Sequence, residues 1–199
     1  INICNQPKGI ICLERTGFKL YLSKKNISAK LEFEKGTMEN LEYVNQGKLD
    51  TQVAKFVQKY QLDPTSLVVV LSDSVTFSKK YTVKSLDKNK HAVDDFLEEL
   101  PFVPDQIVYK NFELGYEPGK AIAVATNINV YIGLVGSFTR LGWSVKAIVP
   151  EIAIGVVGIS VSSISQILKD KKMLQKADFL HSTPEDVLKR AKVSTISSL

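Results

Sequence analysis

The dipeptide Gly119-Lys120 is the feature of this chain closest to a phosphate-binding loop. Such a loop follows the pattern G-x-x-x-x-G-K-[ST], because its backbone N–H groups surround the phosphates and its hydroxyl holds magnesium. Here the upstream glycine, Gly115, is one residue too close, and Ala121 replaces the hydroxyl. Pro118 and Gly119 instead suit the two central positions of a type II turn, which predicts a β-hairpin at this point.

The side chains that usually carry catalysis are few. The two histidines, His91 and His181, are far apart in sequence, and no serine lies in a G-x-S-x-G setting. The acidic pairs Asp94-Asp95 and Glu98-Glu99 recur at helical spacing, as on the solvent-facing side of an amphipathic helix. The residue types therefore predict no catalytic site, and we expect a protein that is not an enzyme.

The composition is that of a folded protein with one large domain or two small ones. The chain has 199 residues, of which 44% are hydrophobic, enough for a substantial core. Its net charge of +5 comes from basic residues spread along the chain, so we predict no nucleic-acid partner. Cys4 and Cys12 lack the spacing of a zinc site, and so few cysteines suit a reducing compartment.

No targeting or membrane-spanning segment is predicted. The chain opens at Ile1 without a basic, apolar leader or an initiator methionine, so we expect a fragment or a processed chain. The longest apolar run, residues 152–168, contains serines and glycines and is shorter than the roughly 20 residues that a spanning helix needs. We expect this run to form a packed helix, without direct membrane insertion.

The first third of the chain predicts a strand meander, a helix and a buried strand. Alternating apolar residues indicate three strands between positions 9 and 34, and residues 35–48 indicate a loop or a short irregular strand. Apolar residues from Leu49 to Tyr60 recur at helical spacing. The run from Leu67 to Leu71 is apolar on both faces, as in a strand covered on two sides.

The middle of the chain alternates strands and helices. Apolar and polar residues alternate from Val75 to Val83, which indicates a half-buried strand. Asn89 is placed to cap a helix that Pro101 ends, and a further helix is predicted from about Val130. A strand is expected over residues 144–149. Core packing is the default expectation for the aromatic residues of these strands, Phe77, Tyr81, Tyr109, Phe112 and Tyr116.

The last fifty residues predict helices. A long apolar stripe at helical spacing runs from Ile154 to Leu168. A capping box over residues 182–185, with a proline inside it, predicts the start of a short final helix.

The order of these segments resembles the PilM family of pilus-assembly proteins, which have an actin-like fold. Residues 68–77 are similar to a strand pair of that family, and residues 92–105 to its helix and proline-containing exit. Residues 106–116 and 120–126 are similar to its next two strands. Residues 130–143 and 144–151 are similar to the helix and strand in which that family has an L-x-x-x-G-[LW]-x-[VP] pattern, here Phe-Thr-Arg-Leu-Gly-Trp-Ser-Val over residues 138–145, with phenylalanine in place of the leucine. Each motif is short, and their order over residues 66–151 carries the resemblance.

The resemblance implies an α/β protein with a partial actin-like, ribonuclease H-like fold and mixed sheets, related also to the cytoplasmic GspL-type domain. Residues 1–70 and 145–199 would form an actin-like core subdomain. Residues 71–144 would form a smaller PilM-type subdomain inserted into it.

The same resemblance implies a scaffold at the inner face of the cytoplasmic membrane, serving a type IV pilus or type II secretion platform. PilM-like proteins bind a short cytosolic tail of a PilN-like inner-membrane protein in a groove between subdomains. Capture of an extended peptide by a sheet edge and flanking apolar pockets is a physical route to such binding. The residues that would border this groove are Val75, Phe77, Tyr81, Phe102 and Val103.

A departure from the actin-like pattern concerns nucleotide. Actin-like ATPases open with a D-x-G-[ST] turn that surrounds phosphate, whereas this chain has Glu14, Arg15, Thr16 and Gly17. We therefore expect no cofactor. Two alternatives stay open: a degenerate actin-like protein that binds Mg-ATP near these four residues, and a free-standing regulator that uses the fold as a dimerisation surface.

Overall fold

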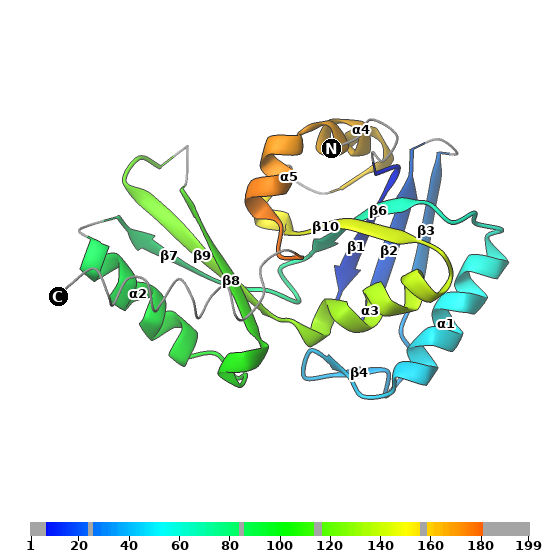
Figure 1. Cartoon of the computed structure of the whole chain (residues 1–199), viewed down its shortest axis with the longest axis horizontal. Coiled ribbons are helices and arrows are strands. Elements are labelled where there is room, and N and C mark those ends of the chain that lie inside the picture. The colour runs from blue at the N-terminus through cyan, green and yellow to red at the C-terminus, as the bar shows by residue number, and fades with distance from the viewer. Residues whose placement is uncertain (1–6, 24–25, 84–85, 114–116, 156–158, 181–199) are drawn as a thin grey trace. The chain divides into compact units, whose positions relative to one another are not determined.

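The computed structural model describes residues 7–23, 26–83, 86–113, 117–155 and 159–180. The chain divides into two compact units (Figure 1). Unit 1 comprises Ile1–Val75 and Asn129–Asp178, and unit 2 comprises Thr76–Ile128 and Phe179–Leu199. The boundaries expected from sequence fell at residues 70 and 145. The second of these differs most from the structure, because the helix that begins at residue 129 packs on a helix of unit 1 and so belongs to that unit.

Unit 1 is built on a five-stranded mixed sheet. Its strands, in spatial order, are β10 (Ser144–Pro150), β6 (Ser66–Leu71), β1 (Gly9–Glu14), β2 (Gly17–Leu22) and β3 (Ile27–Glu32). The first three strands in this order are parallel, and β1, β2 and β3 form the predicted antiparallel meander. Strand β6 lies between two neighbours and its residues 67–71 are all buried, which explains why the sequence there is apolar on both faces.

Two helices cover one face of this sheet. Helices α1 (Gln46–Lys59) and α3 (Asn129–Arg140) pack against each other, and their Phe56 and Phe138 rings both contact Phe18 of β2. Helix α1 begins where the Asn45 side chain accepts a hydrogen bond from the Lys48 N–H. A short hairpin, β4 (Met38–Glu39) and β5 (Glu42–Tyr43), precedes α1 in the region predicted as a loop or short strand.

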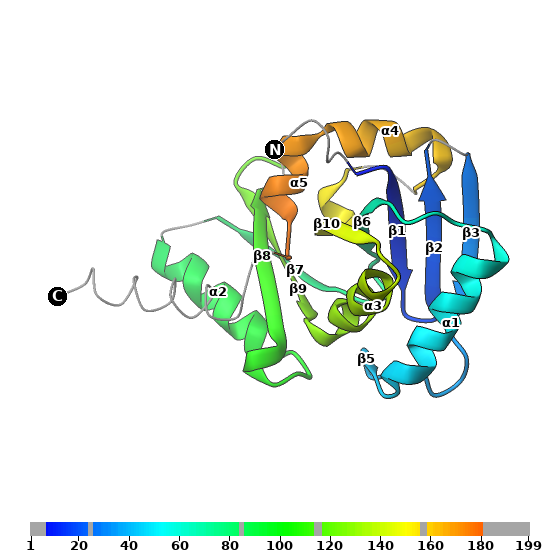
Figure 2. The same ribbon diagram turned by 45° about the vertical axis from the view of Figure 1, so that its right-hand side comes forward.

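The C-terminal helices of unit 1 are shorter than the predicted apolar stripe. The 3₁₀ turn η3 (Glu151–Ala153) directly precedes the stripe, and Gly155 interrupts it, because its φ of +68° cannot continue a helix. Helix α4 (Val161–Lys169) begins after Ser160, whose N–H donates to the Ser163 hydroxyl, and it lies across one end of the sheet strands (Figure 2). Helix α5 (Lys171–Ala177) packs along β10.

Unit 2 is a three-stranded antiparallel sheet with one helix. The sheet order is β7 (Phe77–Thr82), β9 (Lys120–Asn127), β8 (Ile107–Glu113), so β7 is an edge strand. Helix α2 (Leu86–Glu98) begins three residues before Asn89, so Asn89 lies within the helix and the predicted cap is wrong. A 3₁₀ turn, η2 (Pro104–Gln106), leads from α2 toward β8.

The turn between β8 and β9 is the predicted type II turn. The Lys120 N–H donates to the Glu117 carbonyl over 3.1 Å, and Gly119 has φ +77°, the left-handed value that the third turn position requires. The Gly-Lys pair is therefore explained by hairpin geometry.

Several predictions concern residues outside the described part, namely Cys4, Tyr116, His181 and the capping box over residues 182–185. Within the described ranges, no helix combines the length and the apolar character needed to cross a membrane.

Candidate functional site

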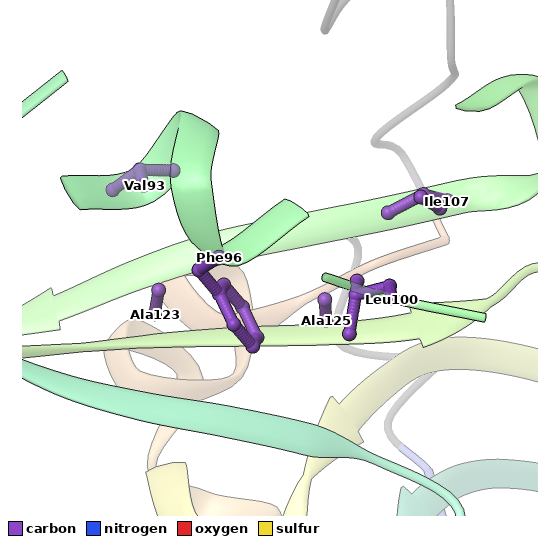
Figure 3. Close-up of a cluster of buried hydrophobic side chains, with 6 residues drawn as sticks. All are labelled: Val93, Phe96, Leu100, Ile107, Ala123 and Ala125. Carbon is purple, nitrogen blue, oxygen red and sulfur yellow. The ribbon is translucent and has the colours of Figure 1, made fainter. Parts of the chain in front are cut away.

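The aromatic residues predicted to bind a partner pack around the cluster that α2 forms with the unit 2 sheet. The small residues Ala123 and Ala125 of the central strand leave room for Phe96 of α2, and Val93, Leu100 and Ile107 complete this buried cluster (Figure 3). Half-buried residues pack around it. We call four of them the aromatic rim: Phe77, Tyr81, Phe102 and Tyr109.

Three of the five predicted docking residues lie in this rim. The Phe77 and Phe102 rings meet edge to face, with centroids 5.4 Å apart. Burial, with a smaller contribution from Tyr109, raises the pKa of Tyr81. Val103 follows Phe102 and is 57% exposed, the largest exposure among the exposed large hydrophobic residues of the described chain. The structure thus brings Phe77, Tyr81 and Phe102 together, with an exposed apolar side chain next in sequence.

Val75 differs from the other four. It is fully buried at the end of a turn in unit 1, where its N–H donates to the Ser72 carbonyl. Its side chain therefore contributes to a core and does not offer a surface to a partner.

Strand β7 is the edge strand that the docking interpretation needs. The Val83 N–H donates to the Gly119 carbonyl, so hydrogen-bonded pairs recur at every second residue of β7, at Tyr81, Lys79 and Phe77. By the same alternation, the backbone groups of residues 78, 80 and 82 face the outer edge of the sheet. The Lys79 side chain lies on the α2 side and forms a 3.0 Å ion pair with Glu99.

The carboxyl ends of the parallel strands β1, β6 and β10 form the second place where a site could lie. Ligands of open α/β sheets usually bind at this edge. Here it carries the β1–β2 hairpin, which contains Glu14, and also Asp73 and Glu151. Burial and the nearby carboxylates of Asp73 and Glu14 raise the pKa of Glu151. Glu14 is neutralised by Lys19, with 2.6 Å between Oε1 and Nζ.

The hairpin residues do not fit a triphosphate. A phosphate cradle needs several free backbone N–H groups, but Glu14 and Gly17 pair with each other across a two-residue turn. The Arg15 N–H already donates to the Ser74 hydroxyl over 3.0 Å, and the Thr16 carbonyl accepts from the Phe33 N–H. Carboxylates at this edge would also repel phosphate.

Gly17 has a structural explanation of its own. A Cβ atom at this position would lie 2.1 Å from the Leu31 carbonyl oxygen of β3, closer than any atom can approach. The glycine is therefore required by the close approach of β3 and needs no ligand to explain it.

The structure also gives no support to a reactive cysteine or a metal site near this edge, within the described residues. Burial, and next the charge of Glu151, raise the pKa of the Cys12 thiol to about 12, so this cysteine is protonated and weakly nucleophilic at neutral pH. In the described part of the chain, no group of three or more His, Cys, Asp or Glu side chains is arranged to hold a metal ion.

Sequence reasoning missed the convergence of Asp73 and Glu151 with Glu14. The signal was present, because Glu14 is the last residue of β1, and Asp73 and Glu151 closely follow the buried strands β6 and β10. What sequence alone did not provide was the pairing of β10 with β6, which brings strands about eighty residues apart side by side.

Comparison with known proteins shows which known structures this fold resembles. No protein-family profile and no curated protein matches the sequence. Among solved structures, the PilM–PilN type IV pilus biogenesis complex matches with a TM-score of 0.51 and 14% identity, over 75% of this chain and 48% of that chain. The chain has a PilM-like fold. The predicted fold class, a partial actin-like α/β fold with mixed sheets, is therefore confirmed.

Two further solved structures match less closely. The cytoplasmic domain of EpsL, an inner-membrane component of the type II secretion system of Vibrio cholerae, matches with a TM-score of 0.47 and 12% identity, over 75% of this chain and 59% of that one. A protein of unknown function with an actin-like ATPase fold from Bacteroides thetaiotaomicron has a TM-score of 0.37 and 9% identity, with coverages of 73% and 54%. The chain thus spans about half the length of the structures it matches.

Proposed function

We propose that this chain is a docking module of a type IV pilus or type II secretion platform, and that it binds the short cytosolic tail of a PilN-like inner-membrane protein. The observation that carries the proposal is the PilM-like fold, because the matching structure is a complex of PilM with PilN. The module has no catalytic role, acts at the inner face of the cytoplasmic membrane and also contacts other platform proteins.

The chemistry of unit 2 supports this function. An extended tail can add to the outer edge of β7 through main-chain hydrogen bonds, while apolar tail residues contact the aromatic rim and Val103. Half-buried aromatic side chains are well suited to this role, because they are held by the core on one side and offer a rigid apolar surface on the other.

The test is a calorimetric titration of the full chain with the cytosolic N-terminal peptide of the PilN-like protein encoded beside it. We expect saturable binding, and we expect Val103→Glu to weaken it at least roughly tenfold, because a charge at the contact loses apolar burial and must be desolvated. Val44→Glu is the matched control, since Val44 is similarly exposed, at 55% against 57%, but belongs to unit 1.

A parallel arm with Mg-ATP separates this proposal from the nucleotide-binding alternative. Tail binding without an ATP signal would support docking. Clear ATP binding without tail binding would overturn the proposal and would direct attention to Glu14 and Arg15. A chain that dimerises and ignores the tail would favour the regulator hypothesis.

A further inference from the structure

Strand β3 is the free edge of the unit 1 sheet, at the opposite end of the strand order from β10. The β10 edge is occupied, because the Ile148 N–H donates to the Asp178 carboxylate over 2.8 Å. Among the described residues, the β3 edge is covered at one end, where the Glu34 N–H donates to the side chain of Gln52.

The backbone of β3 offers hydrogen-bonding groups to an added strand. The Phe33 N–H donates to the Thr16 carbonyl, and with the register of β2 and β3 this makes residues 27, 29 and 31 the inward-bonded set. The backbone groups of Lys30 and Glu32 consequently face outward. Within the described ranges, neither of these outward N–H and C=O pairs has a hydrogen-bond partner.

An open pocket of about 240 Å³ lies directly beside this edge, within unit 1. The pocket is bounded by residues 30–32 of β3 and by Gln52, Lys55, Phe56, Lys59 and Tyr60 from α1 and its C-terminal cap. Alternate side chains of a strand added to β3 would point toward this pocket, because side chains of successive strand residues lie on opposite faces of a sheet.

The pocket carries uncompensated positive charge. Its two carboxylates are already paired, Glu32 with Lys30 at 2.8 Å and Glu34 with Lys48 at 3.3 Å. Lys55 and Lys59 have no carboxylate partner in the described part of the chain, and the Lys59 ammonium lies 5.3 Å from the centre of the Tyr60 ring. An acidic side chain whose methylene groups contact Tyr60 would therefore be complementary to this pocket.

The same charges disfavour a second copy of the chain as the occupant. Pairing of β3 with β3 of another molecule would bring the two α1 helices together beside the shared edge. Lys55 and Lys59 of one copy would then face the same lysines of the other, and like charges in such a contact are destabilising.

We infer that the β3 edge and the adjacent pocket form a docking site for an extended acidic segment of a partner protein, which adds as a sixth strand and places an acidic side chain between Lys55 and Lys59. This site lies in unit 1 and is independent of the tail site proposed on unit 2.

The probe for the test is a nine-residue, end-blocked peptide of alternating threonine and glutamate, titrated into the full chain by calorimetry. We expect saturable binding that the double variant Lys55→Glu/Lys59→Glu weakens roughly tenfold or more. The control Lys172→Glu changes a lysine of α5, away from the pocket, and should leave the affinity unchanged.

Two further arms test strand addition itself. Lys30→Pro removes an outward N–H but none of the hydrogen bonds between β2 and β3, so it should weaken peptide binding. Lys30→Ala keeps that N–H and should therefore bind the peptide more tightly than Lys30→Pro. The second arm uses two peptides, each methylated on one of the two alternating sets of backbone nitrogens, and needs no variant protein. One of the two peptides should fail to bind, because methylation removes the N–H groups that face β3.

Three outcomes would overturn the inference: no binding of the alternating peptide, equal binding of both methylated peptides, or sedimentation that shows a dimer which the peptide dissociates. Binding of the PilN-like tail should be unaffected by Lys55→Glu/Lys59→Glu, so failure of this site and failure of the tail site are distinguishable.

Discussion

Both units contain aromatic rings that meet edge to face, but these rings are buried to different extents. In unit 1, Phe18 is fully buried and meets three rings edge to face, those of Phe33, Phe56 and Phe138, with centroids 5.0 to 6.2 Å away. In unit 2, the Phe77–Phe102 pair has similar geometry, but both rings are only partly buried at the margin of their cluster.

The difference follows from the size of the two cores. Unit 1 places two helices over a five-stranded sheet, and so can enclose a large side chain on all sides. Three strands and one helix enclose less, because small assemblies bury a smaller share of their surface. Aromatic burial therefore serves stability in unit 1, and in unit 2 it leaves apolar surface that a partner can cover.

Phe18→Ala should have the largest effect. Loss of a fully buried phenylalanine is expected to lower the free energy of unfolding by about 3–5 kcal/mol, because it removes burial and leaves a cavity. Denaturant unfolding followed by tryptophan fluorescence reports this directly, since the single tryptophan, Trp143, is buried in unit 1 and its ring contacts Phe138 at 5.5 Å. The control Tyr60→Ala removes an exposed ring and should cost about 1 kcal/mol or less.

Gly17→Ala should have the second largest effect. We expect it to lower the free energy of unfolding by about 1–3 kcal/mol, because the new Cβ would force β3 away from β2. Gly36→Ala is the control: its Cβ would lie in open space, and its φ of +74° alone should cost about 1 kcal/mol. Unchanged stability of Gly17→Ala in the same fluorescence assay would remove the structural explanation of this glycine and revive a ligand-binding one.

Phe102→Ala should lower stability only slightly but weaken partner binding strongly. We expect a loss of about 1 kcal/mol in unfolding followed by circular dichroism, because the ring is only partly buried. Affinity for the PilN-like tail should fall at least roughly tenfold. A large loss of stability with unchanged affinity of the folded protein would make Phe102 a core residue like Phe18, and the contrast between the units would disappear.

Glu151→Gln should give the smallest effect and the opposite sign. The pKa of Glu151 is raised in the folded protein, so its contribution to stability is fully present below the ordinary value of 4.5 and is lost as pH rises through the folded-state value. At pH 7 the half-buried carboxylate is charged and destabilises the fold, and glutamine removes this charge. We expect a slightly higher melting temperature for the variant at pH 7 and none of that gain at pH 3.5, measured by scanning calorimetry.

The local elements could be read from the sequence because their signals are local. Apolar alternation identified the β1–β3 meander, the two-sided apolar run identified β6, and Pro118-Gly119 identified the turn before β9. The failures were local too: Asn89 resembled a cap although α2 begins at Leu86, and the stripe after Ile154 continued in sequence past the break at Gly155.

The sites depended on tertiary structure, because they are made by pairings between distant segments. Phe77 and Phe102 were predicted as neighbours of a docking surface, but only the packing of α2 on β7 and β9 decides that they are half-buried. Val75 was predicted beside them, but the fold places it in unit 1, where it is fully buried. The sequence by itself determined the order and type of the elements, through side-chain periodicity and turn chemistry. Which edge of each sheet stays open and which carboxylates converge were decided by strand order and by the packing of helices on the sheet, since both are set by long-range contacts that no short stretch of sequence encodes.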